Sequence, residues 1–121
     1  MAELTAISEE IELLWKIYAA FNRREVETVL ALMHPDVDWP NGMEGGRVLG
    51  TDAVRSYWTR QFEVLDPRVE PQGFTAEEDG RIAVSIHQVV HDKGGKLVVD
   101  QMIHHVYEIR DGLIQSMEIR A

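Results

Sequence analysis

The 121-residue chain contains no cysteine and no long hydrophobic run. Without cysteine it has no disulfides, no thiolate nucleophile and no zinc or iron–sulfur site built on thiolates. The segment 1–12 carries four glutamates and no basic cluster. No apolar run is long enough to cross a bilayer, so the sequence predicts neither a membrane span nor a signal peptide. We therefore expect a cytoplasmic protein.

Basic residues are also scarce. The chain has 12 Lys plus Arg against 21 Asp plus Glu, which gives a formal net charge of -9. Its three lysines and scattered arginines form no basic stripe to neutralise phosphates, so we expect no nucleic-acid partner. An apolar fraction of 45% is ordinary for a globular protein. We expect residues 1–121 to form a single domain, alone or in a small oligomer.

Hydrophobic residues in the first half of the chain recur three or four positions apart, which is typical of amphipathic helices. The pattern predicts helices over 7–21 and 26–33, the second ending before a proline. A third helix is expected from residue 51 to a point before Pro67. Between the second and third helices we expect a short strand over 37–39 and a flexible, glycine-rich loop over 40–47.

The hydrophobic period changes to two in the second half of the chain, which is typical of β-strands. Three glycine-containing turn signals separate four predicted strands, over residues 68–77, 81–92, 97–110 and 113–120. Three helices with one short strand, followed by an antiparallel meander, predict an α+β fold. We expect the helices to cover one face of a curved sheet.

Turn chemistry predicts which side chains share a face in the first of two hairpins. A two-residue turn at 94–95 pairs Lys93 with Lys96 and, further along, Gln88 with Gln101. The face that carries the two glutamines is mostly apolar, so we expect it to point toward the helices. The two amides would then either satisfy each other or orient a substrate.

The second hairpin extends the same face to a third strand. A three-residue loop over 110–112 pairs Ile109 with Leu113, and therefore His105 with Met117. Both hairpins then place His105 on the helix-facing side of the sheet.

The histidines do not have the spacing of a metal site. In a strand, His87 and His91 stand about 13 Å apart at roughly 3.3 Å per residue. His104 and His105 point to opposite faces. We expect no metal and no cofactor, and interpret His87, His91 and His104 as solvated or interface residues. Their semi-polar face, to which the pairing also assigns Val98, would suit a homodimer formed through the sheet.

His105 is the candidate catalytic residue. A near-neutral pKa makes imidazole a natural general acid or base where a pocket admits substrate. The alternative is a core histidine satisfied by one hydrogen bond. Trp15 and Trp58 at helical spacing are expected in the core, and Trp39 either in the core or at a pocket lip. Asn41 is expected either in a turn or against a ligand.

Four motifs follow one another along the chain: residues 18–22 (YAAFN), 34–39 (HPDVDW), 50–54 (GTDAV) and 106–114 (VYEIRDGLI). This ordered set resembles the nuclear transport factor 2-like (NTF2-like) superfamily, in particular its SnoaL-like and ketosteroid-isomerase-like small domains. The resemblance implies a cone in which a curved sheet wraps a long helix around one deep, mostly apolar pocket, commonly as a homodimer.

Ketosteroid isomerase combines a carboxylate base with a tyrosine and a protonated aspartate as oxyanion donors. The resemblance places these groups at Asn41, at Ile17 beside Tyr18, and at His105. Asn41 cannot take a proton, so steroid isomerisation by the aspartate route is not expected. His105 remains in the donor position, and Tyr18 would reach the site only through a shift of helix register.

We therefore predict an NTF2-like cone that binds a small, mostly apolar metabolite with a carbonyl or hydroxyl group. One alternative is a cofactor-free isomerase, cyclase or dehydratase with His105 as acid or base, which requires His105 to open onto a cavity of roughly 300 Å³. The others are a non-catalytic binder, in which the His105 ring would be closed off from the cavity or hydrogen-bonded only to protein, and a dimerisation or adaptor domain. The other residues expected at the pocket are Tyr18, Trp39, Asn41, Trp58, Gln88, Gln101, Ile103, Tyr107 and Met117.

Overall fold

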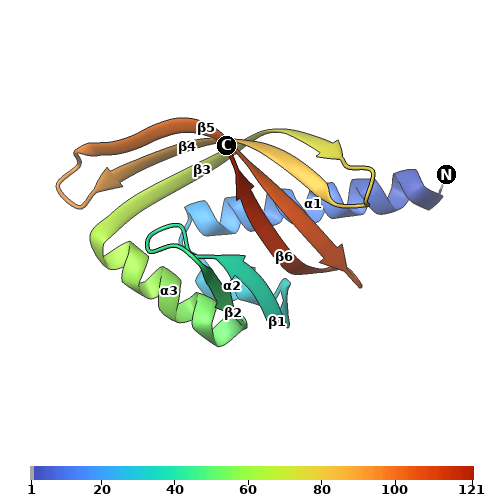
Figure 1. Cartoon of the computed structure of the whole chain (residues 1–121), viewed down its shortest axis with the longest axis horizontal. Coiled ribbons are helices and arrows are strands. Elements are labelled where there is room, and N and C mark those ends of the chain that lie inside the picture. The colour runs from blue at the N-terminus through green and yellow to red at the C-terminus, as the bar shows by residue number, and fades with distance from the viewer. Residues whose placement is uncertain (1) are drawn as a thin grey trace.

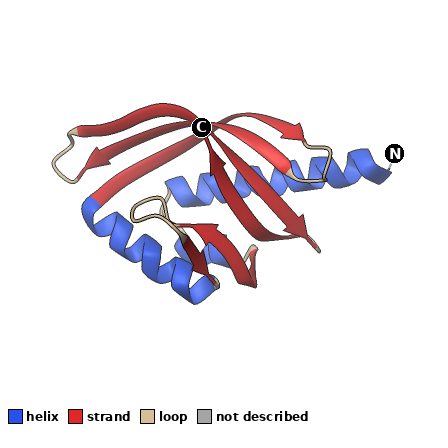
Figure 2. Cartoon of the chain, in the orientation of Figure 1, coloured by secondary structure: helices blue, strands red, loops and turns tan. Residues whose placement is uncertain are grey.

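The structure, a computed structural model, describes the backbone of residues 2–121 and the side chains of residues 7–121. It has the expected α+β architecture, in which a curved sheet covers the long first helix (Figures 1 and 2). Among the described residues, no helix is both long and apolar enough to span a membrane. The elements are α1 (Ala2–Asn22), α2 (Val26–Leu30), β1 (Met33–Pro40), β2 (Arg47–Leu49), α3 (Thr51–Val64), β3 (Leu65–Ala76), β4 (Ile82–Asp92), β5 (Leu97–Arg110) and β6 (Leu113–Arg120).

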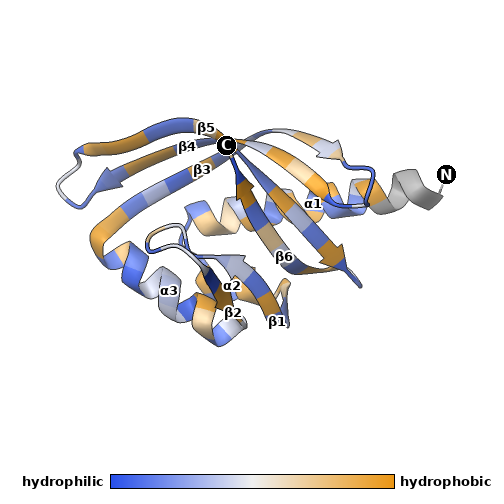
Figure 3. Ribbon diagram, viewed as in Figure 1, coloured by the Kyte–Doolittle hydropathy of each residue, from blue (hydrophilic) through white to orange (hydrophobic). Residues whose placement is uncertain are grey.

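The six strands form one sheet in the order β2-β1-β6-β5-β4-β3. β1 runs parallel to β6, and every other neighbouring pair is antiparallel. Hydrophobic and hydrophilic residues are interspersed along β4, β5 and β6 (Figure 3), as expected for a sheet with one covered face. On β4 the buried positions Ile82, Val84, Ile86 and Val90 share the face that points toward the helices.

The second helix is shorter than predicted. It ends at Leu30, and Met33 opens strand β1 instead of closing the helix. Met33 is buried and pairs with Ile114 of β6, whose N–H donates to the Leu32 carbonyl at 2.9 Å. Pairing with a central strand therefore outweighs the local helical spacing. Strand β2 was not predicted, because three residues carry too little periodic signal.

The register of the β4–β5 hairpin is confirmed away from its tip, where Gln88 pairs with Gln101. At the tip the predicted two-residue turn is wrong. The Asp92 N–H donates to the Lys96 carbonyl at 2.9 Å, and the Asp92 side chain accepts N–H bonds from the loop. A bulge then restores the register, and it brings Val98 to the cavity beside Val99 instead of on the outer face.

The β5–β6 register also differs from the prediction. Arg110 pairs with Leu113 across a two-residue turn whose residues, Asp111 and Gly112, have φ values of 53° and 77°. Positive φ at both positions is what the tight hairpin turn requires. The turn shifts the register by one residue, and a bulge between Glu108 and Ile109 shifts it by one more, so His105 pairs with Ile119, not with Met117. The displacement is two residues, so His105 still faces the helices.

The side chain of Asn22 joins the end of α1 to the outer strand β3. Its Nδ2 donates to the Val69 carbonyl at 2.8 Å, and the Val69 N–H donates to its Oδ1 at 3.0 Å. The amide thus takes the place of a neighbouring strand at an unpaired sheet edge. This pair of bonds helps to hold α1 against the sheet, where it forms one wall of the cavity described below.

Asn22→Ala is expected to lower the free energy of unfolding by about 1–3 kcal/mol, because both backbone groups of Val69 lose their partner. Urea unfolding measures the change. Gln72→Ala is the matched control, because the exposed Gln72 amide makes one bond, of 3.2 Å, to the Glu70 carbonyl. Equal losses in the two variants would contradict the edge-capping role of Asn22.

Candidate functional site

A cavity of about 420 Å³ lies between the helices and the covered face of the sheet. Its walls come from α1, α3, the end of β1 and the loop after it, and strands β3 to β6. Aromatic and aliphatic side chains dominate, and the described residues that line it include no Asp, Glu, Lys or Arg. The site is therefore an apolar hollow with a few neutral polar groups, the usual composition of a small-molecule pocket.

Most residues expected at the pocket lie in the walls of this cavity. Ile103 does not. It is buried in the main hydrophobic cluster with 6% of its surface exposed. Asn41 does not either. The pocket residues that both the sequence and the structure place there are Tyr18, Trp39, Trp58, Gln88, Gln101, His105, Tyr107 and Met117.

Asn41 takes the turn role that the sequence left open. Its Oδ1 accepts hydrogen bonds from the N–H groups of Met43 at 3.1 Å and Glu44 at 2.9 Å. The side chain is therefore committed to its own loop. Its neighbours Gly42 and Met43 line the cavity instead.

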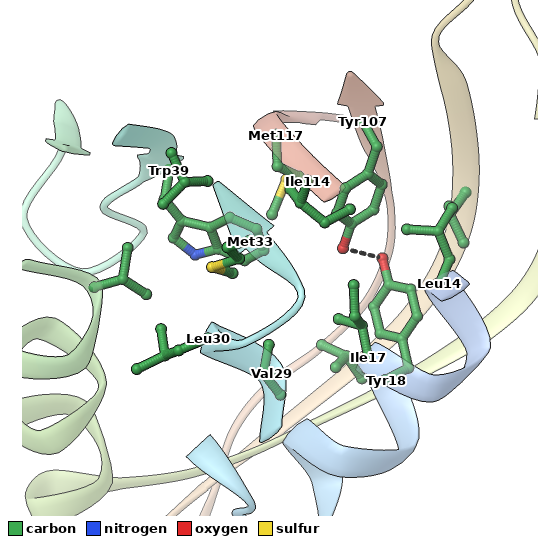
Figure 4. Close-up of a cluster of buried hydrophobic side chains, with 14 of the residues drawn as sticks. Leu14, Ile17, Tyr18, Val29, Leu30, Met33, Trp39, Tyr107, Ile114 and Met117 are labelled. Carbon is green, nitrogen blue, oxygen red and sulfur yellow. Dashed lines mark hydrogen bonds between the residues drawn. The ribbon is translucent and has the colours of Figure 1, made fainter. Parts of the chain in front are cut away.

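His105 ends a short chain of buried hydrogen bonds. The hydroxyl of Tyr107 donates to that of Tyr18 at 2.8 Å, and the Tyr18 hydroxyl lies 2.7 Å from Nδ1 of His105. Figure 4 shows the two hydroxyls, one from β5 and one from α1, pointing toward each other. Tyr18 thus reaches the site without any shift of helix register, contrary to the sequence-based expectation.

The direction of the protons in this chain follows from counting donors. Tyr107 and Tyr18 are almost fully buried, so each hydroxyl hydrogen needs an acceptor. Because Tyr107 donates to Tyr18, Tyr18 donates to Nδ1 of His105. The opposite direction would leave the Tyr107 hydrogen without an acceptor. The neutral ring therefore carries its own hydrogen on Nε2.

Nε2 of His105 opens onto the cavity. Among the described residues Nε2 has no hydrogen-bond partner, whereas every fully buried side-chain nitrogen or oxygen has one. Nε2 is therefore not fully buried, and His105 lines the cavity. Burial lowers the pKa of His105 from 6.5 to about 3 and raises the pKa of Tyr18 and Tyr107. All three groups are neutral near pH 7, so His105 offers the cavity an N–H donor rather than a positive charge.

A second polar group lies on the same face of the sheet. Nε2 of Gln101 donates to Oε1 of Gln88 at 2.8 Å, so the two amides satisfy each other in part, as the pairing predicted. Gln101 and His105 are four residues apart on β5, which is about 13 Å along a strand. These two polar groups of β5 therefore lie at well-separated places along the cavity.

Several cavity residues were missed by the sequence reasoning. Tyr57 follows Val54 by three positions on α3, so its helical spacing could have placed it on the inner face. Met43 lies in an aperiodic loop and gave no such signal.

Two of the other histidines, His34 and His87, lie close to surface groups. Nε2 of His87 lies 2.7 Å from Oδ1 of Asp100, and Nε2 of His34 lies 2.7 Å from the Arg110 carbonyl. Within residues 7–121, no three His, Asp or Glu side chains come together in a way that could hold a metal ion.

Comparison with known families gives one match, which spans most of the chain. The sequence model of the SnoaL-like domain matches residues 16–117. A search of curated proteins finds no significant match.

Many solved structures share this fold. An NTF2-like protein of unknown function from Burkholderia pseudomallei is 27% identical, with 93% of this chain and 89% of that chain covered and a TM-score of 0.80. TerC, co-crystallised with polyporic acid, is 31% identical, with 92% of this chain and 89% of TerC covered and a TM-score of 0.79. A candidate polyketide cyclase from Xanthomonas campestris pv. campestris is 24% identical, with 93% of this chain and 89% of that chain covered and a TM-score of 0.76. These comparisons confirm the NTF2-like fold.

Burial of neutral His105 makes stability depend on pH. Its pKa is 6.5 when exposed and about 3 in the fold, so between these values the unfolded chain binds a proton that the native state does not. The free energy of unfolding therefore decreases as the pH falls through this window, by up to about 1.4 kcal/mol per pH unit from this group. Urea unfolding across the window should show a weaker dependence in His105→Gln, which does not titrate. Identical slopes would contradict a buried neutral ring.

Proposed function

The chain belongs to the family of SnoaL-like domains, and on this premise we propose that its cavity binds an uncharged, largely aromatic small molecule. A carbonyl or similar oxygen of that molecule accepts a hydrogen bond from Nε2 of His105. The observation that carries the proposal is the open N–H of His105 at the end of a buried relay.

The composition of the walls supports an uncharged ligand. A charged group would lose its hydration on entry, and the described lining residues supply no opposite charge. In the cavity wall the Trp39 ring lies 5.6 Å from the ring of Trp58 and 6.2 Å from that of Tyr107, which favours planar, aromatic ligands. The similarity to TerC, which was co-crystallised with polyporic acid, supports binding of a small molecule.

The same donor is suited to cofactor-free chemistry at a carbonyl group. When a proton leaves the carbon next to a carbonyl, negative charge develops on the oxygen, and a preorganised neutral N–H stabilises that charge. Isomerisation, aldol cyclisation and dehydration all pass through such a species. His105 acts here as donor, not as base. If Nδ1 of His105 donated to Tyr18 and Tyr18 donated to Tyr107, the hydroxyl hydrogen of Tyr107 would have no acceptor.

Non-catalytic binding is the second candidate. It is favoured by the absence of a carboxylate among the described lining residues, since proton removal then depends on a group of the substrate itself. The two candidates share the ligand contact and differ only in whether the bound carbonyl compound loses a proton.

We also propose a homodimer formed through the outer face of the sheet. Met102 lies on that face with 58% of its surface exposed, next to the His87–Asp100 pair. Met102→Lys should shift the protein toward monomer in sedimentation experiments, because the lysine ammonium would have to be desolvated at the interface. An unchanged sedimentation profile for a dimeric protein would place the interface elsewhere.

The ligand contact is tested with acetylbiphenyl, an uncharged aromatic ketone, and with biphenyl, which lacks the carbonyl. Trp15→Phe serves as the background, because Trp15 lies outside the cavity and is half-exposed, contrary to the core position expected from its helical spacing. Trp39 and Trp58 line the cavity and report binding by fluorescence. In that background His105→Phe should weaken acetylbiphenyl about tenfold, the loss of one hydrogen bond, and leave biphenyl nearly unchanged.

His105→Gln should restore part of the affinity, because its amide can both accept from Tyr18 and donate to the ligand. Equal loss of both probes in His105→Phe would contradict the proposal. Deuterium exchange into the acetyl methyl group, followed by NMR, separates the candidates. Exchange that depends on His105 indicates catalysis, and binding without exchange indicates a binder.

A further inference from the structure

Tyr57, a cavity residue outside the relay, carries a hydroxyl hydrogen without a partner. Its side chain is buried, with 3% of its surface exposed, and it lines the cavity from α3. The hydroxyl oxygen accepts hydrogen bonds from the N–H of Gly42 at 3.1 Å and from Nε2 of Gln61 at 3.4 Å. A phenol oxygen has two lone pairs and one hydrogen. Both lone pairs are used, and among the described residues the hydrogen has no acceptor.

The Tyr57 hydrogen remains available at neutral pH. Burial raises the pKa of Tyr57 above its ordinary value of 10.0, despite the opposing effect of the backbone N–H groups of Gly42 and Met43. A group that accepts two hydrogen bonds is also a stronger donor, because hydrogen bonds in a chain polarise one another. The α3 wall therefore offers the cavity a neutral O–H donor.

We propose that Tyr57 donates a hydrogen bond to a second oxygen of the ligand, so that the cavity selects uncharged aromatic compounds with acceptor oxygens at two ends, such as diketones and quinones. This inference rests on the proposed function, in which His105 holds the first oxygen. The two donors come from different walls, α3 and β5.

Aromatic rings line the cavity near both donors. The Trp39 ring lies 6.2 Å from the ring of Tyr107, at the relay, and 5.6 Å from the ring of Trp58, which follows Tyr57 on α3. A flat aromatic compound bound along this wall would meet indole rings with its faces.

Tyr57 also holds the loop that follows β1, which provides an alternative explanation for its burial. The loop is closed on itself by the bond from the Gly45 N–H to the Asn41 carbonyl at 2.9 Å, and the Gly42 N–H ties it to Tyr57. Met43 of this loop lines the cavity. Loss of the tether would disturb every ligand alike, whereas loss of a ligand contact affects only compounds with the second oxygen.

The test compares Tyr57→Phe with its parent in the Trp15→Phe background by fluorescence titration. The probes are diacetylbiphenyl, with acceptor oxygens at both ends, and acetylbiphenyl, with one. The shorter pair diacetylbenzene and acetophenone extends the comparison to one ring. Tyr57→Phe should weaken diacetylbiphenyl about five- to tenfold and change acetylbiphenyl less than about twofold. Urea unfolding confirms that the variant is folded.

Equal weakening of the one-carbonyl and two-carbonyl probes, or no weakening of either, overturns the role of Tyr57 in selectivity. Equal weakening would assign Tyr57 to the loop alone. His105→Phe reports on the proposed function separately, because it should weaken both ketones. If that variant binds every probe as its parent does, or if the parent binds none of them, the proposed function fails together with the inference.

Discussion

The hydrogen-bond relay from Tyr107 through Tyr18 to His105 determines the chemistry of the cavity. It joins the long helix to a central strand, and each link is 2.7–2.8 Å long and buried. Since buried polar groups need partners, the relay fixes both the position of the imidazole ring and its tautomer. The hydrogen on Nε2 that faces the cavity is therefore a consequence of two tyrosines that need not touch a ligand at all.

A cavity with neutral walls can still recognise a polar ligand. Burial deprives His105 of its charge, and no charged side chain among the described lining residues replaces it. Recognition then depends on the direction of a few N–H and O–H donors in a medium of low dielectric constant, where each unmet hydrogen bond is costly. Such a site distinguishes compounds by the position of their oxygen atoms more than by their charge. This agrees with the apolar character of the fold's interior.

The sheet shows why a register error left the site prediction largely intact. Glycine turns located both hairpins correctly, yet each contains a bulge that the sequence did not reveal. A bulge changes the partner of a residue, as for His105 and Ile119, but displacements of two residues keep the side chain on the same face. Val98 lies beside a bulge and was therefore assigned to the wrong face. Ile103 shares the covered face with the cavity residues but is buried in the core, a distinction that depends on side-chain packing.

The sequence by itself determined the class of fold, the order of most elements and the presence of His105 on the covered face, because hydrophobic period and turn chemistry are local properties. Only the tertiary structure decided that Tyr18 meets His105 across 87 residues of chain, that Asn41 turns into its own loop, and that Tyr57 faces the hollow. These features depend on how elements distant in the sequence pack together, and on whether their side chains fill the space between them. The hydrophobic period of a segment shows which of its faces is buried, but not whether a cavity remains between that face and its neighbours.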